Sequence, residues 1–116
     1  MADLNTRISD FVWKNLDERH FQGKKDPFWE SLRKTGTEIW LDTGDMNEAE
    51  ANWSAEMSAL TTNNTSINDE IQKGIYDVFI SEAKHLVREL PFEDRVREMS
   101  FIVNARHGLR LASKFG

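Results

Sequence analysis

Residues 38–45 read EIWLDTGD, and residues 57–65 read MSALTTNNT. Each stretch opens with an apolar run of the length of a buried β-strand, and Gly36 and Gly44 bound the first run. We therefore predict strands over residues 38–42 and 57–61. About fifteen residues lie between the strands, which suits a helical crossover between two parallel strands.

The segment between the strands predicts that crossover helix. Asp45 is a good helix N-cap, and Glu48 stands where a capping box needs an acidic residue. We expect a helix from Met46 to about Trp53.

Helical spacing of apolar residues extends over most of the remaining chain. Pro27 favours a helix start, Gly36 favours a helix end, and Pro91 favours a break between two long helices. Four helices are predicted outside the strand pair, over residues 4–20, 27–32, 67–90 and 92–114. With two parallel strands, this pattern predicts the α/β class.

Composition limits the function classes. The net charge is −5, with 15 basic and 20 acidic residues, which argues against binding to nucleic acid or to an anionic membrane. Cysteine is absent, so disulfides, a thiolate nucleophile and cysteine metal ligands are excluded. His20, His85 and His107 show no metal-ligand spacing, and we expect no metal and no cofactor. Neither a signal peptide nor a membrane span is evident, and we expect a cytoplasmic protein.

Polar side chains follow both predicted strands. Asp42, Thr43 and Asp45 follow the first strand, and residues 61–65 follow the second. The carboxyl ends of parallel strands meet at one edge of a sheet, where α/β proteins bind their ligands. An acid and an amide placed together there can orient a hydroxylated substrate and transfer a proton.

The motif IWLDTGD, followed about twenty residues later by ALTTN, resembles the opening βαβ unit of transaldolase, and INDEIQKGIYD is similar as well. The resemblance runs from about Glu38 to Gly116. It implies the N-terminal part of a (β/α)8 TIM barrel, preceded by a helical extension. The implied domains are residues 1–37 for the extension and 38–116 for the first βαβα part of the barrel.

The family implies a cofactor-free reaction in the pentose phosphate pathway. A lysine forms a Schiff base with a ketose phosphate such as sedoheptulose 7-phosphate, and a dihydroxyacetone unit passes to an aldose phosphate such as glyceraldehyde 3-phosphate. By resemblance, Asp42 is the catalytic acid–base residue, and Asn63 and Thr62 bind the substrate. Asn64 stands where the family commonly has proline, which alters the stiffness of that turn.

In the family, the Schiff-base lysine lies on the fourth strand, and a catalytic glutamate lies on the third. We therefore expect this chain to be a fragment that is inactive alone and prone to self-association, because two strands leave open sheet edges. None of its own lysines is expected to be the nucleophile. Sugar phosphate is the expected substrate class once the barrel is complete.

Three alternatives remain open at this stage. The chain could be a non-catalytic helical interaction module that keeps the βαβ unit without its chemistry. It could also belong to a related fructose 6-phosphate aldolase, which releases the ketone unit instead of transferring it. Finally, both polar clusters could be ordinary strand ends and helix caps.

Overall fold

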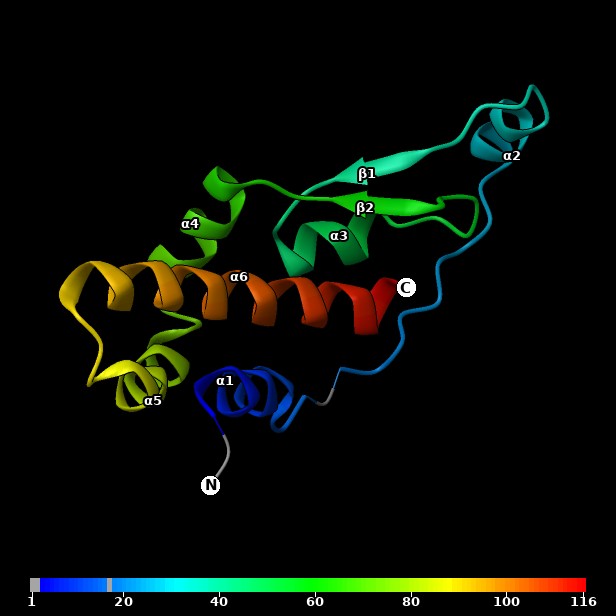
Figure 1. Ribbon diagram of the computed structural model, residues 1–116. Helices are drawn as coiled ribbons and strands as arrows, with labels where there is room; N and C mark the ends of the chain where they lie inside the picture. The colour runs from blue at the N-terminus through cyan, green and yellow to red at the C-terminus, as the bar shows by residue number, and fades with distance from the viewer. Residues whose placement is uncertain (1–2, 17) are drawn as a thin grey trace.

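The computed structural model describes residues 3–16 and 18–116 (Figure 1). Within these residues the chain forms a mixed α/β structure in which one two-stranded parallel sheet is accompanied by helices. The elements, in order, are α1 (Leu4–Trp13), α2 (Pro27–Arg33), β1 (Trp40–Asp42), α3 (Met46–Asn52), β2 (Ala59–Thr61), α4 (Asn64–Gln72), α5 (Asp77–Val87) and α6 (Phe92–Phe115).

The long helix α6 runs through the middle of the molecule (Figure 1). The strands lie on one side of it with α3 between, and α1 and α5 lie on the other side. Helix α2 projects at the far end of the sheet, beyond the rest of the chain. The radius of gyration is 16.9 Å, whereas a compact chain of this length has about 13 Å. The molecule is therefore elongated.

The sheet confirms the predicted parallel pairing. Trp40 pairs with Ala59, Leu41 with Leu60 and Asp42 with Thr61. The strands are shorter than predicted, because regular pairing begins only at Trp40 and Ala59. Two strands do not close a barrel, and the described residues form one two-stranded sheet.

The first apolar core lies between α1, α5 and α6. Five residues are buried there, and Leu4, Phe11, Phe79, Met99 and Leu109 are among those that pack around them. Phe11 and Phe79 stack with ring centroids 4.7 Å apart. The five buried residues are Ile8, Val12, Ala83, Val87 and Ile102.

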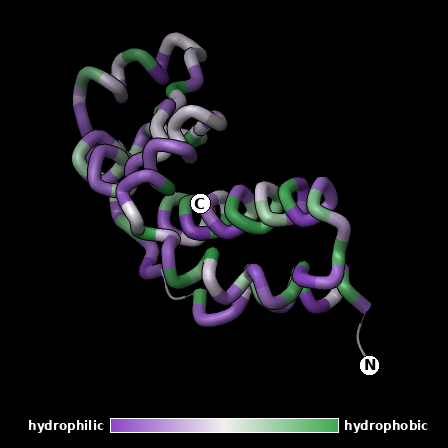
Figure 2. Tube along the Cα trace, turned by 90° about the vertical axis from the view of Figure 1, so that its left-hand side faces the viewer, coloured by the Kyte–Doolittle hydropathy of each residue, from purple (hydrophilic) through white to green (hydrophobic). Residues whose placement is uncertain are grey.

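The second core lies between the sheet, α3 and the end of α6. Ala49, Leu111 and Phe115 are buried, and Leu41 and Leu60 reach them from the strands. Helix α6 thus contributes to both cores. In the hydropathy view (Figure 2), hydrophilic and hydrophobic residues alternate along the helical segments, as expected for helices that bury only part of their surface.

The prediction of one helix over residues 67–90 is wrong. The chain forms α4 and α5, separated by a turn at Gly74, which has φ +84°. The periodic apolar pattern continues through the turn, but Ile75 and Val78 are 49% and 74% exposed. A glycine in the left-handed region ends α4, and tertiary packing overrides the longer helical pattern.

The predicted helix over residues 4–20 also differs from the structure, although residue 17 lies outside the described residues. Helix α1 ends at Trp13, and Asn15 has φ 55°. The Arg106 guanidinium donates to the carbonyls of Val12 and Lys14, at 2.8 and 2.9 Å. These bonds satisfy carbonyls that a continuing helix would have used itself.

No helix in the described part of the chain combines the length and the apolar character that a membrane crossing requires. Helix α6 has 24 residues, but charged side chains recur along it.

Candidate functional site

Asp42 and Thr61 meet at the carboxyl end of the sheet. They are register partners, and the Thr61 hydroxyl donates to Asp42 Oδ1 at 3.0 Å. The Thr43 backbone N–H donates to the Thr61 carbonyl at 2.9 Å, which continues the pairing by one residue. The Asp42 carboxylate is exposed at this edge, oriented by a neighbouring hydroxyl.

Asn63 follows on the same edge as the N-cap of α4. Its Oδ1 accepts a hydrogen bond from the Ser66 backbone N–H at 2.9 Å. Asn63 is exposed, and the structure gives its side chain no other hydrogen bond within the part of the chain that it describes. The amide therefore caps a helix through its oxygen, and its two N–H donors face no described acceptor.

Thr62 points inward instead. Its Oγ1 is buried and has no hydrogen-bond partner among the described residues. The hydroxyl lies 2.8 Å from the position that a Cβ on Gly44 would occupy. A buried hydroxyl without a partner is destabilising, so a ligand or water that reached it would gain a hydrogen bond.

Gly44 makes this edge compact. A Cβ at this position would lie 2.7 Å from Ser66 Cβ, closer than side chains approach each other. The loop after β1 and the first turn of α4 can therefore touch only because residue 44 lacks a side chain. This close contact brings the segments after the two strands together.

Asp45 caps α3 as predicted. Its Oδ1 accepts from the N–H groups of Asn47 and Glu48, at 2.8 and 3.0 Å. In the predicted capping box the Glu48 side chain would accept from the Asp45 N–H. In the structure the Asp45 N–H donates instead to Thr43 Oγ1 at 3.1 Å. The threonine hydroxyl is nearer along the chain and leaves the Glu48 side chain exposed to solvent.

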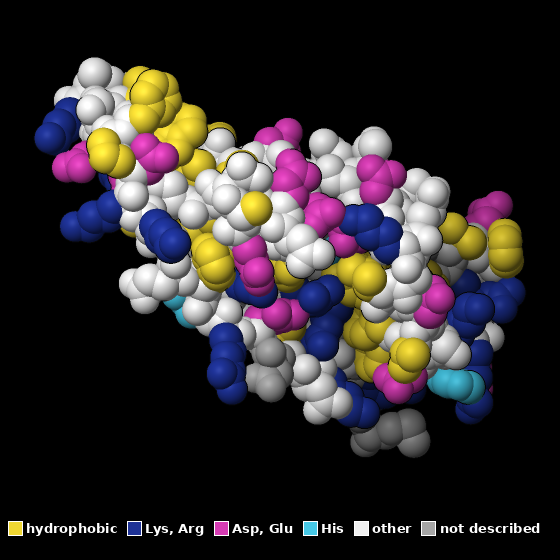
Figure 3. Space-filling view, turned by 180° about the vertical axis from the view of Figure 1, so that it is seen from behind, with side chains coloured by type: hydrophobic (Ala, Val, Ile, Leu, Met, Phe, Trp, Pro, Cys, Tyr) yellow, Lys and Arg dark blue, Asp and Glu magenta, His cyan; other side chains and the backbone are white. Residues whose placement is uncertain are grey.

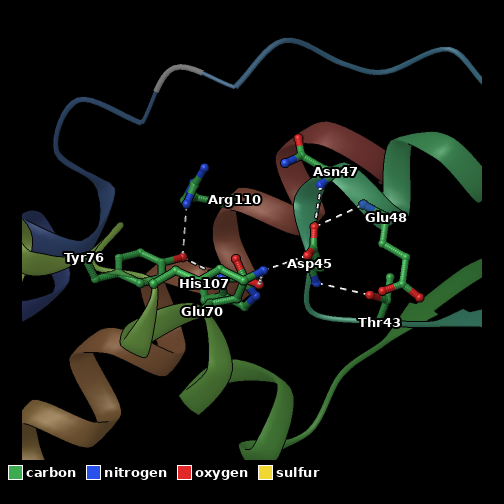
Figure 4. Close-up of polar contacts among 9 residues, drawn as sticks. Thr43, Asp45, Asn47, Glu48, Glu70, Tyr76, His107 and Arg110 are labelled. Atoms are coloured by element: carbon green, nitrogen blue, oxygen red, sulfur yellow. Dashed lines mark hydrogen bonds and ion pairs between the residues drawn. The ribbon is translucent and has the colours of Figure 1, made fainter.

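A polar cluster that sequence reasoning missed lies beside this loop (Figure 4). Lys73 Nζ bridges Asp45 Oδ2 and Glu70 Oε1, each at 2.7 Å. The hydrogen bond from Lys73 is the main cause that lowers the pKa of Asp45. The bond to Asp45 is likewise the main cause that raises the pKa of Lys73, which stays protonated. A lysine held as an ammonium ion cannot act as a Schiff-base nucleophile.

Helix α6 adds His107 and Arg110 to this cluster. Arg110 donates from Nε to Glu18 at 2.6 Å and from a terminal nitrogen to the Tyr76 hydroxyl at 3.2 Å. The Tyr76 hydroxyl and His107 Nδ1 are 2.5 Å apart. Because Arg110 already donates to the hydroxyl oxygen, the hydroxyl proton points to Nδ1, which places the ring proton of a neutral imidazole on Nε2.

Burial sets the protonation of this pair. Burial lowers the pKa of His107 and raises the pKa of Tyr76, so both groups are neutral near pH 7. The Gly44 carbonyl favours the charged form of His107, yet Nε2 has no well-aligned hydrogen bond within the described residues. His107 therefore reaches the same loop that carries the strand-end residues.

The cluster borders a cavity of about 500 Å³. Acidic and basic side chains line it, and Asp45, Glu70, Lys73 and Arg110 are paired with one another or with Glu18 and Tyr76. Such an arrangement fixes α3, α4 and α6 around the sheet edge more readily than it binds a charged ligand. No cluster of metal-ligating side chains occurs in the part of the chain that the structure describes.

The candidate site therefore has an exposed layer and a buried support. Asp42 and Asn63 are exposed at the strand ends, whereas Thr62 and Gly44 lie beneath them. The sequence indicated Thr62 and Gly44, which follow the predicted strands, but it did not indicate the contact between Tyr76 and His107. Tyr76 and His107 are 31 positions apart, and no spacing rule connects them.

Comparison with known proteins yields no relatives. No family model matches the chain, and neither a curated protein nor a solved structure matches it.

Proposed function

We propose that this chain provides the first two strand ends of a transaldolase-type Schiff-base site for sugar phosphates. One observation supports the proposal most strongly: Asp42 and Thr61 meet across a parallel strand pair, and Thr62 and Asn63 follow on the same edge. The motif resemblance places the catalytic aspartate and the substrate-binding asparagine at these positions.

The contacts suggest a division of roles. Asp42 Oδ1 accepts from Thr61, so Oδ2 is the oxygen that would exchange a proton with a substrate hydroxyl. The Asn63 N–H donors would bind a substrate oxygen while its carbonyl oxygen caps α4. Thr62 would contribute its hydroxyl only if the loop at Gly44 shifted to expose it.

We do not assign the Schiff-base lysine to any of the lysines in this chain. In the family it belongs to the fourth strand, and the resemblance here covers the first two. The transaldolase-type activity therefore requires a protein that contains both these strand ends and a Schiff-base lysine on a fourth strand. There the dihydroxyacetone unit would pass from sedoheptulose 7-phosphate to glyceraldehyde 3-phosphate.

Borohydride trapping tests this proposal. The product of the complete open reading frame that encodes these residues would be incubated with sedoheptulose 7-phosphate, reduced with borohydride and analysed by intact mass. We expect a reduced dihydroxyacetone adduct on one lysine. Asp42→Asn should lower transfer to glyceraldehyde 3-phosphate by about a hundredfold or more, the contribution of a general acid–base residue.

Asp69→Asn is the matched control, because Asp69 is an exposed acid on α4. Its turnover should equal that of the unmodified protein. Absence of both adduct and transfer in the complete product would refute the proposal. Unchanged turnover in Asp42→Asn would remove that carboxylate from the mechanism.

The need for an aldose phosphate acceptor distinguishes a transaldolase from the related aldolase. A fructose 6-phosphate aldolase would release dihydroxyacetone without any aldose phosphate, whereas a transaldolase needs the aldose phosphate to complete turnover. Product release measured with and without glyceraldehyde 3-phosphate distinguishes them.

One observation favours the non-catalytic alternative, an interaction module. Trp40 on β1 is 60% exposed and Phe28 on α2 is 67% exposed, and each strand of a two-stranded sheet has an unpaired edge. Such a surface suits self-association. Sedimentation velocity over a range of concentrations tests it, with Trp40→Ser expected to reduce the associated fraction.

A further inference from the structure

A trough runs along the hairpin of α5 and α6, and α4 lines its narrower end. Two adjoining hollows, of about 590 and 390 Å³, share Met99 and Ser100 in their linings. Helix α6 supplies Phe92, Val96 and Val103 to the trough. From residue 92 to residue 103 a helix rises about 16 Å, the length of three helical turns.

The floor of the trough is apolar and partly open to solvent. Phe92 is 70% exposed and Val96 is 51% exposed, whereas Val87 beneath them is buried. The apolar positions of α6 recur three or four residues apart, which is the spacing that receives the apolar face of another helix.

The rim at the wider end is basic. Lys84, Arg88 and Arg95 line it together with His85, and no acidic residue lines either hollow among the described residues. This local charge contrasts with the net charge of −5 for the whole chain. Figure 3 shows Lys and Arg side chains among hydrophobic and acidic ones at the end of the molecule that α5 and the start of α6 form, on the right of that view.

Arg95 is a partly buried member of this rim. Its guanidinium lies over the Phe92 ring, 5.7 Å from the centroid. Its Nε is buried and has no hydrogen-bond partner among the described residues. A buried N–H donor without a partner favours any ligand that brings an acceptor to it.

We propose that this trough binds an amphipathic α-helix of a partner protein whose flanks are acidic. The apolar face of that helix would pack on Val96 and Met99, and its carboxylates would pair with Arg88 and Arg95. The length of the trough favours a helix over a small ligand, and the basic rim selects the acidic flank.

The probe is a fluorescein-labelled designed peptide of about 18 residues, long enough for helix formation. It carries leucine at helical i, i+3, i+4 and i+7 spacing and glutamate on its flanks. Binding is measured by fluorescence anisotropy against the folded chain. We expect saturable binding that weakens as salt rises, and at least about tenfold weaker binding of a peptide with lysine in place of glutamate.

Two exposed positions test the trough itself. Arg88→Glu should weaken binding of the acidic peptide at least about tenfold and improve binding of the basic peptide. Val96→Glu should weaken the acidic peptide by a similar factor, because it puts a like charge on the apolar floor. Arg97→Glu and Phe101→Glu are matched controls on α6, since neither residue lines the trough, and both should bind as the unmodified chain does.

Circular dichroism confirms that each variant keeps its helical content. Equal binding of acidic and basic peptides, or equal loss in the Arg97→Glu control, would overturn the proposal. Absence of saturable binding would overturn it as well. Self-association that disappears in Val96→Glu would assign the trough to a second copy of this chain and would also overturn it.

Discussion

The two halves of this molecule are stabilised by different interactions. The helical half, formed by α1, α5 and the first part of α6, buries five apolar residues, among them Ile102, which is 0% exposed. The strand half, formed by the sheet, α3 and the end of α6, has three buried core residues in the described part of the chain. It relies instead on a close approach at Gly44, on the hydrogen bond that Asp45 accepts from the Asn47 N–H, and on the one that Thr61 donates to Asp42.

This difference follows from the kinds of side chain that each half contains. Apolar burial gives the largest stabilisation per residue, but it leaves no polar groups for a ligand. The strand half keeps exposed polar groups at the sheet edge, and close contacts and caps hold them in place. The predictions below test whether the two halves respond to substitution in these different ways.

Ile102→Ala should have the largest effect. It removes a fully buried side chain from the core of the helical half, and the free energy of unfolding should fall by about 3 kcal/mol. Urea denaturation measures this change. Val78→Ala is the control, because Val78 is 74% exposed, and it should change stability by less than about 0.5 kcal/mol. Similar losses in both variants would mean that the helical core is not packed as described.

Gly44→Ala should have the largest effect in the strand half. The added methyl would overlap Ser66 Cβ and Thr62 Oγ1, at 2.7 and 2.8 Å, and should cost about 1–3 kcal/mol. Gly108→Ala, within α6, meets no atom within 4 Å. It should stabilise the protein by about 0.5–1 kcal/mol, because alanine favours helix more than glycine does. Thermal denaturation of both variants gives the comparison, and equal shifts would contradict the close contact at Gly44.

Acidification should affect the strand half through His107. Burial lowers its pKa in the folded protein, so the unfolded chain binds a proton at higher pH than the folded chain does. The stability from the neutral ring is complete above the unfolded pKa of about 6.5 and declines below it, by at most about 1.4 kcal/mol per pH unit. Urea denaturation at several pH values from 7.5 to 5.5 measures the slope.

His107→Gln should remove that part of the pH dependence, even if it lowers stability at every pH. His85→Gln is the control, because His85 is exposed on α5, and its profile should match that of the unmodified chain. A slope that persists in His107→Gln would assign the acid sensitivity to other groups.

Much of the fold was predictable from local sequence. The parallel strand pair, the helix capped by Asp45 and the break at Pro91 follow from run length, cap chemistry and proline geometry, and the structure confirms them. The turn at Gly74 was missed, because the apolar spacing of Ile71, Ile75 and Val78 continues across it. Only the glycine itself signalled the break, and isolated glycines also occur inside helices.

The exposed residues of the candidate site could be predicted from the sequence, but the contacts beneath them could not. Asp42 and Asn63 stand next to predicted strands, so strand order alone places them at one edge. The contacts of His107 with Tyr76, and of Arg110 with Glu18, depend on how α6 lies against the other elements. Tertiary packing of that kind leaves no local pattern in the sequence. Large aromatic side chains commonly pack in a core, yet Trp13 and Trp40 are 57% and 60% exposed.

Helix α6 is a single rigid element shared by both halves. Ile102 belongs to the helical core, and Leu111 and Phe115 belong to the core beneath the sheet. Opening either core therefore removes support from the same helix, which couples the two openings. Amide protons in the middle of α6 should then exchange with solvent only when the whole domain opens. A ligand that binds at either end would slow that exchange along the whole helix.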